Sequence, residues 1–271
     1  MLARGRMLLT NCMEIWSVRR AARHAAALAY YSMFALAPIL YVVVRIAGRF
    51  LSEAAVTDAT GTILVNLMGT EVAGYVRELV ANTAATTAGG SMLTTFISIG
   101  ALLYAATSFF VHLQRTLDSI WGTPPPTQSS VRRFLVRRLI SFAMVIGLGI
   151  ILVLAVFAGT AVNLLQNLLG ISSRIQVANL AVMFGLGVLT FAAIFKTLPV
   201  AQVPWRHCLA GGAVTTLLLG IGGTVMVVYL RISNAGTAFE AAGSLAVLLI
   251  GVYYTAQLFL AGAVFTRALG E

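Results

Sequence analysis

Long apolar runs are the feature that most constrains the fold of this chain. Six stretches of about 20 residues are each long enough to cross about 30 Å of hydrocarbon at about 1.5 Å per helical residue. These predicted spans cover residues 25–46, 92–111, 139–165, 177–198, 209–230 and 244–266. Only 10% of the 271 residues are charged, whereas a soluble domain carries about 25%. We therefore expect an all-α, polytopic membrane protein, which excludes a soluble enzyme, a disordered chain and a disulfide-stapled secreted module.

Basic residues are distributed unevenly between the connections of these spans. Thirteen of the 18 lie in the N-terminal segment, in the 112–138 and 196–208 connections and at the C-terminus, whereas four lie on the opposite side. Five of the eight acidic residues lie on that arginine-poor side. Because basic connections stay in the cytoplasm, both termini are predicted to be cytoplasmic. An even number of spans requires the same arrangement, so we expect a single membrane domain over residues 1–271.

Two amphipathic helices are predicted outside the spans. Residues 8–23 combine an apolar stripe containing Trp16 with a group of arginines, which is typical of a helix in the headgroup region. Residues 64–82, inside the long connection 47–91, show an apolar face and a polar face at helical spacing. We expect the first helix to lie at the cytoplasmic surface and the second at the outer surface.

Four stretches of sequence together are similar to one family of membrane proteins. They are ALAYYSMFALAP at 27–38, DSIWGTPPP from Asp118 followed by RRFLVRRL, KTLP at 196–199 with VPWRHCLAGGAV at 203–214, and AAGSLAVLLIGVYYTAQLFLAGAVFTRA at 241–268. In this order, and with six spans, they resemble the YihY/virulence factor BrkB family, whose older members carry the name ribonuclease BN. The resemblance implies an inner-membrane protein of bacteria with transport or lipid translocation as its expected activity.

Two positions in the last span depart from the pattern of that family. The resemblance implies a tryptophan near position 251, where this chain has Gly251, and an acidic residue near position 264, where it has Val264. A coupling or pairing role of that acid would therefore not carry over to this chain.

Residues that could carry hydrolytic chemistry are scattered along the chain. Phosphodiester hydrolysis needs carboxylates or histidines gathered on metal ions. The three histidines show no metal-ligand spacing, and the three acids predicted on the cytoplasmic side are far apart in sequence. Cys12 and Cys208 form no metal or redox motif. We therefore expect no enzyme activity, no catalytic residues, no metal and no cofactor, and no nucleic-acid partner in spite of the net charge of +10.

The most unusual polar feature lies in the first predicted span. Pro38, Tyr41, Arg45 and Arg49 recur at spacings of three and four and so share one helix face. An arginine inside a membrane is costly and indicates a site, and two guanidinium groups suit a phosphate or a carboxylate. The alternative is that both side chains extend to the outer headgroups. Other polar residues are predicted at the same depth: Asn163, Gln166, Asn167, Asn179, Arg231 and Asn234.

The last two spans also carry polar and small residues at helical spacing. Tyr253 and Gln257 are i, i+4 neighbours near the middle of the membrane, where a glutamine needs a partner or a water-filled cavity. An interhelical hydrogen bond and a substrate contact both remain open. Small residues at every fourth position from 208 to 224 predict a closely packed helix face that includes Gly212 and Gly220.

Together these features predict a transporter or translocator of an anionic amphipathic molecule such as a lipid. Membrane lipids are the expected partners, with anionic headgroups at the arginine-rich cytoplasmic side. The alternative is a non-transporting scaffold that recruits envelope partners through its basic loop and outer helix. A polar cavity continuous with Arg45 would favour transport. A packed core with only peripheral polar groups would favour the scaffold. The candidate substrate-binding residues are Pro38, Tyr41, Arg45, Arg49, Asn163, Asn167, Asn179, Tyr253 and Gln257.

The charge asymmetry makes the topology testable by cysteine labelling of intact cells. A membrane-impermeant reagent is expected to reach single cysteines placed within 52–88 and not those placed within 122–130, because the second segment belongs to the basic side. Labelling of the 122–130 segment from outside would contradict the predicted orientation.

Overall fold

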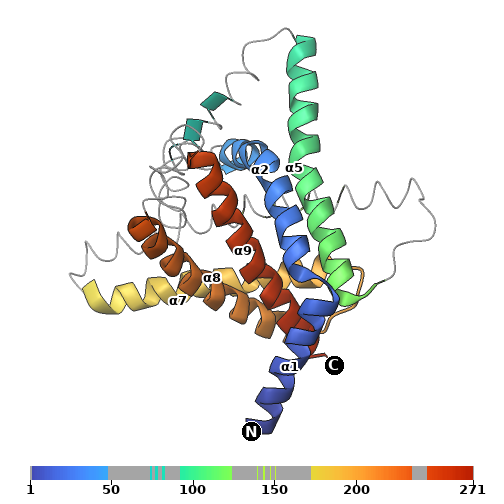
Figure 1. The fold of residues 1–271 in the computed structure, drawn as a ribbon. Helices are drawn as coiled ribbons and strands as arrows, with labels where there is room; N and C mark the ends of the chain where they lie inside the picture. The colour runs from blue at the N-terminus through green and yellow to red at the C-terminus, as the bar shows by residue number, and fades with distance from the viewer. Residues whose placement is uncertain are drawn as a thin grey trace.

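All regular structure in the described part of the chain is α-helical. The computed structural model describes residues 2–47, 92–123, 172–233 and 243–270, together with single positions between 74 and 150. The described helices are α1 (Leu2–Val18), α2 (Ala21–Ala47), α5 (Met92–Trp121), α7 (Ser172–Thr197), α8 (Trp205–Ser233) and α9 (Gly243–Ala268) (Figure 1). The all-α prediction is confirmed for these residues.

Five of the six predicted spans coincide with helices, namely α2, α5, α7, α8 and α9. The predicted span 139–165 lies outside the described residues except for helical positions 139, 143, 147 and 150. Within the described part, α7, α8 and α9 contain segments long and apolar enough to cross a membrane: Leu180–Thr197, Trp205–Met226 and Leu248–Ala268. The crossing of the membrane by all six spans stays a prediction.

The first amphipathic segment is divided, so the prediction of one helix over 8–23 is wrong in its boundaries. The helix α1 ends at Val18, and Arg20 adopts the left-handed conformation with φ 51° before α2 begins. On α1, Ile15 is buried and Trp16 packs against the core, whereas Met13 is 73% exposed. The apolar stripe therefore splits into a packed part and an exposed part.

Of the predicted outer helix, positions 74, 77, 78, 81 and 82 are described, and they are helical and exposed.

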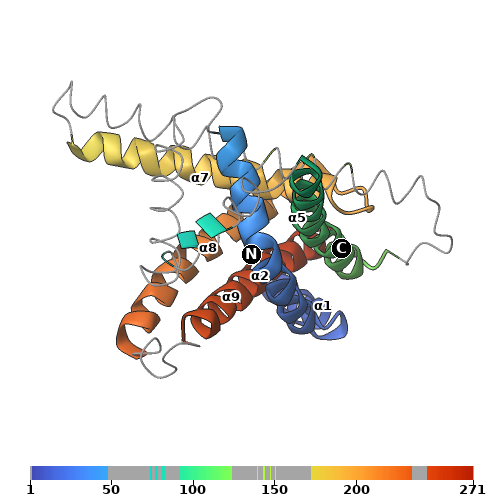
Figure 2. The same ribbon diagram turned by 90° about the horizontal axis from the view of Figure 1, so that it is seen from above.

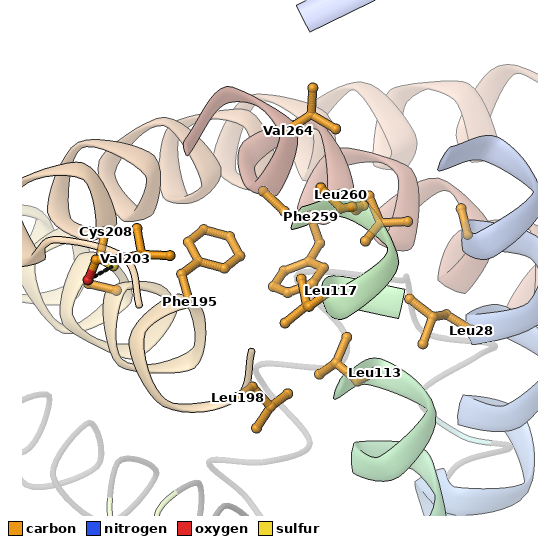
Figure 3. Packing of buried hydrophobic residues seen from close by; sticks show 14 of the residues in the cluster. Leu28, Leu113, Leu117, Phe195, Leu198, Val203, Cys208, Phe259, Leu260 and Val264 are labelled. Atoms are coloured by element: carbon orange, nitrogen blue, oxygen red, sulfur yellow. Dashed lines mark hydrogen bonds between the residues drawn. The ribbon is translucent and has the colours of Figure 1, made fainter. Parts of the chain in front are cut away.

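The helices converge at one end of the molecule, which we call the base. There the α1–α2 turn, the C-terminal ends of α5 and α9, and the 198–204 connection between α7 and α8 come together, and from there the helices diverge (Figures 1 and 2). The C-terminus lies at the base, and α1 extends beyond it (Figure 1). Phe195 lies at the centre of the buried core, with its ring centroid 5.3 Å from that of Phe259 and 6.1 Å from that of Trp121 (Figure 3). The fully buried Leu117 and Leu260 belong to the same cluster.

The helix α8 packs through two different faces onto α7 and α9. On the α9 side, Gly211 lies against Thr266, and Gly262 of α9 lies against Thr215. Each of these threonines donates its hydroxyl hydrogen bond to the glycine carbonyl one turn earlier in its own helix, at 2.7 Å in both cases. The crossing is therefore reciprocal, because each helix presents a glycine to the other helix's threonine. Close approach of this kind is what small residues permit between membrane helices.

The predicted small-residue face at 208–224 is correct only in its lower half. Gly212 lies against the backbone of Val188 and Ala192 of α7, and Thr216 lies against Gly187. By contrast, Gly220 has no atom near the place where a Cβ would lie, and Thr224 is exposed. At that level α8 still packs onto α9, since Gly222 lies against Leu258 and Tyr254, but the face with Gly220 and Thr224 meets no described neighbour.

The reciprocal crossing predicts opposite effects of two glycine substitutions. Gly262→Ala is expected to lower stability by about 1–3 kcal/mol, since its methyl group would overlap Thr215. Gly220→Ala is the matched control and is expected to be neutral or stabilising by up to about 1 kcal/mol, because alanine is the better helix former. Thermal unfolding in detergent measures both, and equal destabilisation by the two variants would contradict the packing.

Candidate functional site

The C-terminal end of α5 is closed by a Schellman motif at the base. Gly122 adopts φ +72°, its N–H donates to the Ser119 carbonyl at 3.1 Å, and the N–H of Thr123 donates to the Asp118 carbonyl at 3.0 Å. The Thr123 hydroxyl donates to the same Asp118 carbonyl at 2.8 Å. The left-handed conformation explains why a glycine stands at this position. The helix therefore ends at the same point at which the other elements of the base arrive.

Two arginines from other elements lie against this helix end. A guanidinium nitrogen of Arg267, from the last turn of α9, donates to the carbonyl of Ile120. The guanidinium group of Arg19, from the α1–α2 turn, covers Gly122 so closely that a Cβ there would lie 2.5 Å from Nη2 of Arg19. The C-terminus of a helix carries partial negative charge, which favours cations at this place. The arginines thus join α1 and α9 to the end of α5.

A buried carboxylate fastens the connection between α7 and α8 to the same place. Asp118 is only 9% exposed, and its Oδ1 accepts a hydrogen bond of 2.8 Å from the backbone N–H of Val200. On the other side of the connection, Lys196 Nζ donates to the carbonyl of Val203 at 2.8 Å and lies 6.0 Å from the ring centroid of Trp205. Buried charges are tolerated when they are paired or hydrogen-bonded. We call the group Arg19, Asp118, Ile120, Val200 and Arg267 the basal junction.

Two contacts that involve histidine side chains join α2 and α5 along the seam between these helices. The Nε2 atom of His24 lies 3.2 Å from the Ser119 hydroxyl, and the rings of Tyr31 and His112 are stacked with centroids 3.5 Å apart. Burial and the charge of Arg23 lower the pKa of His24 below its ordinary value, because both disfavour the charged ring. Because 24 contacts 119 and 31 contacts 112, the two helices run antiparallel along this seam.

The side chains of most predicted substrate-binding residues lie outside the described part of the structure. Pro38, Tyr41 and Arg45 belong to α2 and Asn179 belongs to α7, but their side chains are outside the described residues, as are Arg49, Asn163 and Asn167 altogether. The outer arginine site therefore stays a prediction.

The two predicted residues on α9 are described. Tyr253 packs against the buried core. Gln257 is half-buried, and within the described part of the chain no hydrogen bond reaches it. The two departures from the family pattern lie on the same helix: Gly251 is buried near Met226, and Val264 is 1% exposed within the core.

The basal junction itself was not foreseen in the sequence. The partners of Lys196 and Asp118 are backbone groups of other elements, which carry no mark in a sequence. A signal was nevertheless present. Two of the four stretches that carry the family resemblance supply Asp118 and Arg267, and Val200 directly follows the KTLP at 196–199 of a third. Among the described residues, no group of three His, Cys, Asp or Glu side chains is placed to hold a metal ion.

The regular structure that the described residues form is all helical, and three of the described helices are apolar enough to cross a membrane; this defines the class, a helical membrane protein. The family model described as Virulence factor BrkB matches residues 14–271, and the chain belongs to this family.

Curated relatives agree with this assignment. The chain is 27% identical over 261 residues to a UPF0761 membrane protein of Vibrio atlanticus, covering 92% of this chain and 77% of the relative. It is 26% identical to one of Chromobacterium violaceum, covering 93% of this chain and 59% of that relative, and 25% identical to one of Aeromonas salmonicida, covering 91% and 83%. The chain thus spans well under two thirds of the second relative. No solved structure matches the chain.

The basal junction predicts different effects for two substitutions of Asp118. Asp118→Ala leaves the Val200 N–H without its acceptor and is expected to lower stability by about 1–3 kcal/mol. Asp118→Asn retains a side-chain oxygen for that N–H and is expected to recover part of the loss. Thermal unfolding of the purified variants measures the difference. Equal stability of the parent and Asp118→Ala would contradict a structural role for the carboxylate.

Proposed function

We propose that this protein translocates an anionic amphipathic molecule, with a lipid as the substrate class, across the bacterial inner membrane. In this proposal both termini face the cytoplasm and the base is the cytoplasmic end of the bundle. The observation that carries it is the arrangement of the helices, which are fastened at a polar base and diverge above it (Figure 1).

Polar contacts at the base are compatible with a protein that changes between two conformational states. The contacts at the base join side chains to single backbone groups of other elements, at Val200 and Ile120. Such contacts can be exchanged for others, and packed interfaces tend to have discrete alternatives. We therefore propose that the basal junction is the closed cytoplasmic end of a translocation path.

The preference for an anion rests on the basic side chains. The proposed outer end of the path is the pair Arg45 and Arg49, whose guanidinium groups can offer a bidentate fork to a phosphate. At the other end, α1 presents the exposed apolar side chains of Leu9 and Met13 beside arginines of the α1–α2 turn. We propose that α1 lies in the cytoplasmic headgroup region and that anionic headgroups gather there. The proposal involves no covalent chemistry on the substrate.

A reconstituted lipid-translocation assay tests the proposed function. Purified protein in vesicles carrying a trace of fluorescent phosphatidylglycerol is expected to move the probe between leaflets faster than empty vesicles do. Fluorescent phosphatidylcholine is the neutral comparison and is expected to move more slowly. Arg45→Lys retains the charge but loses the fork, so it is expected to slow translocation by about fivefold, which corresponds to about 1 kcal/mol for one lost charge-assisted hydrogen bond.

Three results would count against this account. Translocation no faster than in empty vesicles would favour the non-transporting scaffold. Equal rates for both fluorescent lipids would remove the preference for an anion. Unchanged translocation by Arg45→Lys would indicate that this arginine only extends to the outer headgroups.

A further inference from the structure

One exposed face of α2 carries a cation at the base and aromatic rings above it. Arg23, Ala27, Tyr30 and Phe34 follow one another at spacings of four, three and four residues, so they share a helix face. Tyr30 is 55% exposed and Phe34 is 58% exposed, and their rings meet edge to face at 5.1 Å. Arg23 and Ala27 are also exposed. This face is therefore an open strip that changes from basic to aromatic along the helix.

The helix α5 presents a matching strip. Arg115 is exposed near the base, and Tyr104, eleven residues earlier on the same face, is 65% exposed. Between them Ser108 is half-buried, with its hydroxyl donating to the Tyr104 carbonyl at 2.6 Å. On both helices the arginine and the aromatic residue are eleven positions apart, which is about 16 Å along the axis. This length is close to half of the hydrocarbon core, about 15 Å.

The seam contacts set the two strips at comparable heights. The contacts of His24 with Ser119 and of Tyr31 with His112 place Arg115 level with residue 28 of the antiparallel α2. Arg23 is five residues closer to the base, which is about 7 Å along the axis. Two long side chains at this offset can reach a single group between them. The two helices are in contact and lie side by side near the base (Figure 1).

The charges near the seam have one sign. Arg23 directly precedes His24 and Arg115 lies one turn after His112, so both arginines lie close to the seam. Of the described acids near the base, Asp118 is buried against Val200, and Glu14 lies on α1. The lower end of the surface therefore suits an anion, and its upper part suits a hydrocarbon chain.

We propose that this α2–α5 surface binds one anionic phospholipid of the leaflet at the base. The phosphate lies between Arg23 and Arg115, where each guanidinium donates charge-assisted hydrogen bonds. An acyl chain lies along Tyr30, Phe34 and Tyr104. The site lies on the outside of the α2–α5 pair, and its occupation does not require translocation. Binding without translocation would overturn only the proposed function, and translocation without binding at this surface would overturn only this inference.

Lipid-dependent thermal shift and native mass spectrometry of the purified protein test the site. Phosphatidylglycerol is expected to bind and stabilise the parent, whereas phosphatidylcholine and inorganic phosphate are not, because the site needs both charge and chain. Arg23→Gln with Arg115→Gln is expected to weaken phosphatidylglycerol binding by at least about tenfold. Arg206→Gln is the matched control, since Arg206 is an exposed arginine near the base on α8.

A second pair of variants leaves every charge in place. Ala27→Trp fills the strip between Arg23 and Tyr30 and is expected to weaken binding to a similar extent. Ala26→Trp is its control, because Ala26 is also exposed but points about 100° around the helix. Both positions are exposed, so neither variant disturbs the core.

Each of the following results would contradict the proposed lipid site. If the double arginine variant and Ala27→Trp bind phosphatidylglycerol like the parent, the surface is only a lipid-facing one. If Arg206→Gln or Ala26→Trp weakens binding as much as its partner variant, the effect comes from general charge or bulk. If phosphatidylcholine binds equally, the arginines do not recognise the headgroup. If inorganic phosphate alone stabilises the parent equally, the ligand is a free anion.

Discussion

The end of α5 is the point on which the rest of the described structure depends. In a membrane the hydrophobic effect does not draw helices together, because lipid tails are as apolar as leucine side chains. Association must come from close packing and from polar contacts that have no better partner. The end of α5 supplies the second kind: Asp118 receives the N–H of Val200, and the Ile120 carbonyl receives Arg267. These two contacts bring the α7–α8 connection and α9 to one place.

The first kind of contact, close packing, keeps α7, α8 and α9 together once they have arrived there. Gly211 and Gly262 allow α8 and α9 to cross at short range, and Gly212 does the same toward α7. These small residues lie in the lower half of α8, whereas Gly220 faces open space. The face of α8 that packs on α7 at the base is thus open above it, whereas α8 stays packed on α9 as far as Gly222 and Leu258. This asymmetry is the physical basis on which we propose a path closed at its cytoplasmic end.

The helices could be predicted from the sequence, but the junction could not. The length of the apolar runs alone locates α2, α5, α7, α8 and α9, because a run of about twenty apolar residues is typical of a membrane-spanning helix. The break at Arg20 was missed because a left-handed turn is usually marked by glycine or asparagine. The junction was missed because Asp118 and Arg267 bind backbone groups from distant parts of the chain. The outer site around Arg45 stays a prediction, since its side chains are outside the described residues.

Hydrogen–deuterium exchange of residues 198–204 is the most direct test of the central claim that the junction holds the base together. Val200 and Gln202 are both exposed and lie in a non-helical connection, yet the Val200 N–H donates to a buried carboxylate, whereas among the described residues the Gln202 N–H has no acceptor. We predict slow exchange at Val200 and fast exchange at Gln202, with protection at Val200 lost in Asp118→Ala while the amides of α8 remain protected. Equally fast exchange at both positions in the parent protein would contradict the account.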